Sequence, residues 1–106
     1  MNFFSPLVSC LLVLASGTSA VAAQGVLDRV REGGALVIAH RDSSVPFSYL
    51  DTKTGKPIGY AMDLCLHLAD VVRRATGRKD MAVEFVAVTS ANRVATVAEG
   101  RADLEC

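Results

Sequence analysis

The sequence predicts an α/β fold in which a mostly parallel sheet is flanked by helices. Residues 35–39 form a continuous apolar run of strand length, which indicates a strand covered on both faces. Segments with helical and with strand patterns alternate along the rest of the chain, and such alternation is typical of parallel sheets joined by helices. The 106 residues include 11 basic and 11 acidic side chains. No net attraction to nucleic acid or to an anionic membrane is therefore expected.

The first 23 residues have the pattern of a secretory signal peptide. An apolar run at 7–15 is followed by small residues that end in Ala22 and Ala23, and this order predicts cleavage after one of the two alanines. The run is too short to cross ~30 Å of hydrocarbon as a helix. Residues 7–10 also fit a lipobox, the minor interpretation, in which Cys10 would carry a lipid. We therefore divide the chain into a signal peptide at 1–23 and a secreted domain at 24–106.

The first half of the domain begins with a short helix at 26–31 that ends at two glycines. The apolar strand at 35–39 follows and leads into a polar loop at 40–45. Alternating apolar residues on either side of a turn then predict a hairpin at 47–60.

The second half opens with the clearest helix of the chain, at 62–75. We expect one apolar stripe of this helix to face the sheet; its members are Leu64, Leu68, Val71, Val72 and Ala75. A second strand at 82–88 is followed by a helix at 91–99, for which Ser90 is a suitable N-cap. Residues 102–106 begin a third strand, and a buried strand in this position predicts that the sequence continues in a longer protein.

Two cysteines remain once the signal peptide is removed. Cys65 lies in the long helix, where it is most simply explained as a small buried apolar residue. Cys106 ends the third strand, and the two thiols could also pair with each other. The sequence leaves both alternatives open.

Polar residues follow two of the predicted strands, at the sheet edge where open α/β folds bind their ligands. Arg41 follows the first strand, and Ser90 and Arg93 follow the second. A helix opening at Ser90 would offer free N–H groups and a positive dipole to an anion. The alternatives are a solvent-exposed Arg93 and a weak surface ion pair of Arg41 with Asp42 or another nearby acid. Two guanidinium groups at neighbouring strand ends predict a ligand with two carboxylates.

The remaining side chains do not form a recognisable catalytic or cofactor-binding motif. His40 has no second ligand at metal-binding spacing, and His67 is expected either to extend its ring toward solvent or to make a local hydrogen bond. Phe47 and Tyr49 fit a pocket wall and a core contact equally well. We expect no metal, no cofactor and no nucleic-acid partner.

Four segments of the chain resemble the bacterial periplasmic solute-binding proteins for polar amino acids, in particular the glutamate/aspartate-binding components of ABC importers. They are GGALVIAHRDSSVPFSY at 33–49, IGYAMDL at 58–64, VTSANRV at 88–94 and ADLEC at 102–106. The resemblance covers nearly the whole secreted domain. It implies a fold of two lobes that close over the ligand, of which this sequence holds the N-terminal lobe and lacks the second lobe.

The resemblance also implies roles for single residues. Arg93 would clamp the α-carboxylate of the ligand, Ser90 would add a hydrogen bond, and Arg41 would meet the side-chain carboxylate. The cysteine at the position of Cys106 usually has a partner much later in the chain, so Cys106 would be unpaired here. The implied partners are an acidic amino acid and an ABC importer permease in the inner membrane, and a monomer is expected.

We therefore expect a periplasmic, non-enzymatic subunit of an ABC amino-acid importer that binds glutamate or aspartate. The chain itself would be a fragment with weak or no binding alone, because half of the pocket would be open to water. Three alternatives are a periplasmic dehydratase-type enzyme on the same two-lobed fold, the extracellular sensor domain of a receptor, and a small secreted domain without a ligand.

Overall fold

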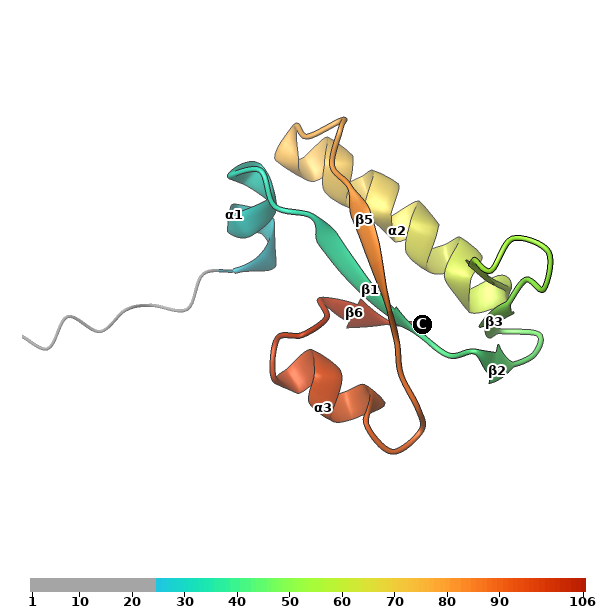
Figure 1. Ribbon diagram of the computed structural model, residues 1–106. Helices are drawn as coiled ribbons and strands as arrows, with labels where there is room; N and C mark the ends of the chain where they lie inside the picture. The colour runs from blue at the N-terminus through green and yellow to red at the C-terminus, as the bar shows by residue number, and fades with distance from the viewer. Residues whose placement is uncertain (1–24) are drawn as a thin grey trace, which may run out of the picture.

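The computed structural model describes residues 25–106, so the predicted signal peptide, its cleavage sites and Cys10 lie outside the described residues. Three helices and six short strands follow one another in the order shown in Figure 1. The elements are α1 (Val26–Arg31), β1 (Leu36–His40), β2 (Ser43–Ser44), β3 (Ser48–Leu50), β4 (Pro57–Ile58), α2 (Tyr60–Thr76), β5 (Val83–Ala87), α3 (Arg93–Ala98) and β6 (Leu104–Glu105).

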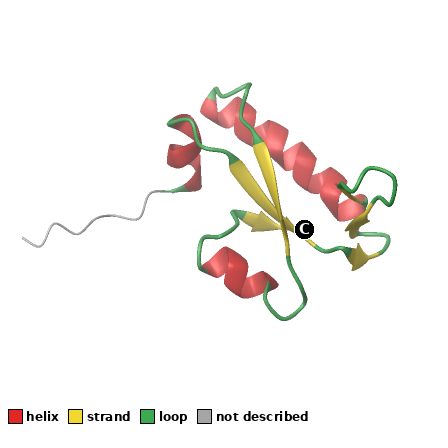
Figure 2. Cartoon of the chain, in the orientation of Figure 1, coloured by secondary structure: helices red, strands yellow, loops and turns green. Residues whose placement is uncertain are grey.

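Strand β1 is the central strand of a parallel sheet with the order β5–β1–β6. Its Ile38 is in register with Phe85 of β5 on one side and with Leu104 of β6 on the other. Parallel neighbours need long crossover connections, and α2 and α3 provide them here (Figure 2). The predicted α/β class with a parallel sheet is confirmed.

The two faces of β1 contribute to two separate apolar cores. Leu36 and Ile38 pack with residues of α1 and α2, whereas Ala39 packs with Val88, Ala102 and a residue of α3. Figure 1 accordingly shows α2 along one face of the sheet and α3 near the other. The prediction that the apolar run at 35–39 is a strand covered on both faces is confirmed, because helices pack against both sides of β1.

The face of α2 that contacts the sheet differs from the predicted one. Met62 and Ala69 are fully buried and Cys65 is partly buried, whereas of the predicted stripe only Val72 packs against the core. The other predicted members are exposed: Leu64, Leu68, Val71 and Ala75. The helix carries apolar residues on two adjacent stripes, so periodicity alone could not select the buried one.

A second, antiparallel sheet holds the start of α2 in place. Its order is β2–β3–β4, so the segment predicted as a polar loop contributes a strand to the predicted hairpin. The N–H groups of Tyr60 and Ala61 donate to the carbonyl oxygens of Pro46 and Phe47 at 3.0 and 2.9 Å. These backbone carbonyls satisfy N–H groups that lack an intrahelical partner, and among residues 25–106 no side chain caps this end of the helix.

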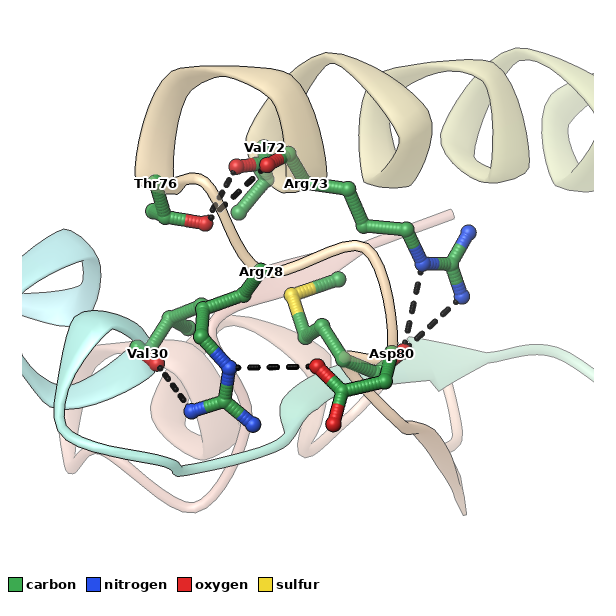
Figure 3. Close-up of polar contacts among 7 residues, drawn as sticks. Val30, Val72, Arg73, Thr76, Arg78 and Asp80 are labelled. Carbon is green, nitrogen blue, oxygen red and sulfur yellow. Dashed lines mark hydrogen bonds and ion pairs between the residues drawn. The ribbon is translucent and has the colours of Figure 1, made fainter.

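The other end of α2 is tied to its neighbours by two arginines (Figure 3). Arg73 donates to the carbonyl oxygen of Met81 from Nε and Nη2, at 3.2 and 3.0 Å. Arg78 donates to the carbonyl oxygen of Val30 at 3.2 Å and to Asp80 at 3.3 Å. The hydrogen bond and positive charge of Arg78 lower the pKa of the Asp80 carboxyl. These bonds join α1, α2 and the start of β5.

Helix α3 begins later than predicted. It starts at Arg93 with Asn92 in the N-cap position, whereas Ser90 lies in the preceding turn. The Asn92 side chain accepts a hydrogen bond from the N–H of Thr89 at 2.7 Å, and the Thr89 hydroxyl accepts one from the N–H of Asn92 at 3.3 Å. These local bonds stabilise a turn in competition with the helix.

Cys65 and Cys106 form a disulfide between α2 and the end of β6, with their Cα atoms 6.6 Å apart. The expectation of an unpaired Cys106 is therefore wrong, as is the simpler explanation of Cys65 as an isolated apolar side chain. The N–H of Cys106 donates to the carbonyl oxygen of Ala39 at 2.9 Å. This bond extends the pairing of β6 with β1 and brings Cys106 to the core that α2 covers.

Candidate functional site

A shallow cavity of about 350 Å³ lies at the carboxyl ends of β1 and β6. Arg41 follows β1, Glu105 belongs to β6, and Arg93 opens α3. The other lining residues are Ser44, Phe47, Ser48, Ala61 and Cys106. The structure thus places two of the three predicted ligand-binding residues, both arginines, around one cavity at the predicted edge of the sheet.

The backbone of Arg41 is held by a buried serine. The hydroxyl of Ser48 accepts a hydrogen bond from the N–H of Arg41 and donates one to its carbonyl oxygen, both at 2.9 Å. Ser48 is 1% exposed, so these bonds form away from water. This arrangement fixes the point from which the Arg41 side chain extends.

The guanidinium of Arg41 has no side-chain partner within residues 25–106, so the alternative of an ion pair with Asp42 is not realised. Asp42 instead lies beside His40, with Oδ1 at 3.2 Å from Nδ1. The two atoms are not aligned as a hydrogen bond, and Nδ1 of the buried His40 has no hydrogen-bond partner among the residues that the structure describes. Arg41 therefore remains available to an anion in the cavity.

The guanidinium of Arg93 forms an ion pair with Glu105 through one of its three nitrogen atoms. Its Nε lies 3.9 Å from Oε2 of Glu105, and the two side chains are 46% and 20% exposed. The alternative of an Arg93 that extends alone into solvent is therefore not what the structure contains. The ion pair involves Nε, and the two terminal Nη atoms have no other partner in the described part of the chain.

Ser90 does not line the cavity, and its side chain is exposed in the turn before α3. The N–H groups of Thr89 and Asn92 are bonded within this turn, and that of Arg93 donates to the Thr89 carbonyl at 3.1 Å. The helix therefore opens at Arg93 and not at Ser90 as predicted. The ligand-binding role of Ser90 stays a prediction that rests on the resemblance.

Ser48 and Glu105 belong to the site although the sequence pattern did not single them out. Ser48 stands between two aromatic residues, and only the pairing of β3 shows that Ser48 is the buried one. Phe47 is exposed and lines the cavity, while Tyr49 is half-buried in β3. Glu105 could be placed at the cavity only from the register of β6 against β1.

The described residues contain no group of three or more potential ligands that could hold a metal ion. Among the helices of residues 25–106, none combines the length and the apolar character that crossing a membrane requires.

The profile of the bacterial extracellular solute-binding proteins, family 3, matches residues 36–106. The chain belongs to this family. The match includes the central strand β1, both arginines of the cavity and the end of β6.

Three curated relatives have related names. The chain is 38% identical to the L-glutamate/L-aspartate-binding protein of Pseudomonas aeruginosa over its whole length. It is 36% and 37% identical to the glutamate/aspartate import solute-binding proteins of Escherichia coli and Salmonella typhimurium, over 83% and 82% of its length. The chain spans 36%, 29% and 28% of these relatives, so it corresponds to about a third of each.

Two solved structures share the fold. The L-cystine solute receptor of Neisseria gonorrhoeae, in its unliganded open conformation, matches 78% of this chain and 32% of its own with a TM-score of 0.61 and 22% identity. An ancestral cyclohexadienyl dehydratase matches 74% of this chain and 30% of its own, with a TM-score of 0.57 and 28% identity. The chain has the fold of a lobe of the periplasmic-binding-protein type.

Proposed function

We propose that this chain is the N-terminal lobe of a periplasmic solute-binding protein that captures glutamate or aspartate for an ABC importer. The observation that carries the proposal is the cavity that Arg41 and Arg93 share at the carboxyl edge of the sheet. The names of the three relatives support the same class of ligand. An importer permease would receive the ligand from the closed protein.

Each arginine would bind one carboxylate of the ligand. The guanidinium fork matches a carboxylate through two parallel hydrogen bonds. Arg41 is anchored through Ser48, and within residues 25–106 its guanidinium and the Nη atoms of Arg93 have no side-chain partner. Arg93 would take the α-carboxylate and Arg41 the side-chain carboxylate, with Ser90 adding a hydrogen bond once a ligand is present. The cavity is open, so the lobe alone would bind weakly.

The test is calorimetric titration of glutamate and aspartate into the protein as its gene encodes it. Arg41→Ala and Arg93→Ala should each weaken binding at least about tenfold, because each removes a charge-assisted contact worth ~1.5–3 kcal/mol. Arg101→Ala is the matched control, because Arg101 pairs with Glu99 and does not line the cavity. Unchanged affinity in both cavity variants would overturn the proposal.

A dehydratase-type enzyme is the second candidate, because one of the matching structures is a dehydratase. It would act on a cyclic amino-acid precursor within the same two-lobed fold. The two candidates differ in the fate of the bound molecule, since a transport subunit returns its ligand unchanged. Recovery of glutamate after prolonged incubation, together with no turnover of cyclic dienyl acids, would decide for the transport subunit.

A further inference from the structure

The cavity at the carboxyl edge of the sheet contains a carboxylate as well as two guanidinium groups. Three of its lining residues are charged: Arg41, Arg93 and Glu105. Their formal charges sum to one positive unit. A cavity built only to hold two carboxylates would not need an acidic side chain, and such a side chain would repel them.

The placement of Glu105 makes its charge effective inside the cavity. Its side chain is only 20% exposed, so solvent screens its charge less than that of a surface residue. Backbone pairing holds it there, since Glu105 is in register with Ala39 of β1 and the next residue donates to the Ala39 carbonyl. Its single ion-pair partner within residues 25–106 is Arg93, at 3.9 Å.

The ion pair leaves room for a ligand on Arg93. Glu105 approaches the Nε of the guanidinium, whereas a carboxylate can bind through the two terminal Nη atoms. A ligand carboxylate bound there would lie close to the Glu105 carboxylate. A ligand that also carries an ammonium group beside this carboxylate would compensate the repulsion, and a ligand without the ammonium group would not.

We propose that Glu105 is a specificity-determining residue that makes the cavity select α-amino dicarboxylates over dicarboxylates without an amino group. This inference rests on the proposed function. Glutamate carries a net charge of minus one, which balances the net charge of plus one on the three cavity residues. Glutarate has the same carbon chain and two carboxylates but no ammonium group, so its net charge is minus two. The additional negative charge would be repelled by the Glu105 carboxylate.

The experiment compares the Kd of glutarate with the Kd of glutamate by calorimetry, in the protein as its gene encodes it. The measured quantity is the Kd of glutarate divided by the Kd of glutamate. In the Glu105→Gln variant this ratio should fall about tenfold, which is the effect of one charge a few ångströms away at a partly exposed site. Glu105→Asp keeps the charge and should keep the wild-type preference. Glu99→Gln is the matched control, because Glu99 is exposed, pairs with Arg101 and does not line the cavity.

The outcomes separate this inference from the proposed function. A ratio that stays the same in Glu105→Gln while glutamate still binds overturns the role of Glu105 and leaves the proposed function in place. Failure of the wild-type protein to bind either acidic amino acid overturns both. A fall in the ratio for Glu105→Gln, with Glu105→Asp and Glu99→Gln unchanged, supports the inference, because a purely structural defect would weaken both ligands alike.

Discussion

Single residues position the side chains of the cavity, and Ser48 is the clearest case. Its hydroxyl satisfies both the N–H and the carbonyl oxygen of Arg41 while it is buried. Ser48→Ala should therefore lower the free energy of unfolding by ~1–3 kcal/mol, because two backbone groups lose their partner. Urea unfolding followed by circular dichroism measures this. Ser43→Ala, at an exposed position of the same small sheet, should change stability by less than ~0.5 kcal/mol, and equal losses would contradict the role of Ser48.

Two of the three charged residues of the cavity could be predicted from the amino-acid sequence. Arg41 and Arg93 could be predicted, because each follows a segment with a clear strand pattern and polar residues at strand ends gather at one edge. Glu105 could not be assigned to the site in the same way. Its position depends on the register of β6 against β1, and register follows from packing between segments far apart in the chain.

At the scale of elements, the start of α2 depends on a glycine. Gly59 has a φ of 128°, and a Cβ atom there would collide with the carbonyl group of Phe47, whose oxygen accepts the hydrogen bond of Ala61. Gly59→Ala should therefore lower the free energy of unfolding by about 2–4 kcal/mol, through backbone strain and loss of this cap. Thermal unfolding followed by circular dichroism measures the loss.

Gly55 provides the matched control for this prediction. It also has a positive φ, of 69°, but a Cβ atom there would meet no other atom within 4 Å. Gly55→Ala should therefore cost only the conformational penalty of ~1–2 kcal/mol. If both variants lost the same stability, the close approach of Phe47 to Gly59 would not matter.

In the molecule as a whole, contacts between distant segments hold α1 against the sheet. The Asp103 carboxylate accepts hydrogen bonds from Arg29 of α1, at 2.5 Å, and from the N–H of Val37, at 2.8 Å. The Arg29 side chain also donates to the carbonyl oxygen of Ala35 at 3.1 Å. One carboxylate thus joins the first helix, the central strand and the approach to the last strand.

The disulfide joins Cys65 of α2 to Cys106, which follows β6, across a sequence separation of 41 residues. Its reduction should lower the free energy of unfolding by about 2–4 kcal/mol, because the unfolded chain gains conformational freedom. Thermal unfolding with and without dithiothreitol tests this. The Cys65→Ser/Cys106→Ser double variant is the control and should melt at the same temperature in both buffers. A wild-type melting temperature that does not respond to the reductant would refute a stabilising role.

The α/β class, the buried central strand, the approximate position of each helix and the edge at which Arg41 and Arg93 lie could all be predicted from the amino-acid sequence. These features follow from local patterns, since apolar runs, helical periodicity and turn residues act over a few neighbours. Three features became visible only in the folded chain: the stripe of α2 that is buried, the pairing of Cys106 with Cys65, and the position of Glu105 at the cavity. Each of these depends on contacts between segments far apart in the chain, and local sequence patterns do not specify such contacts.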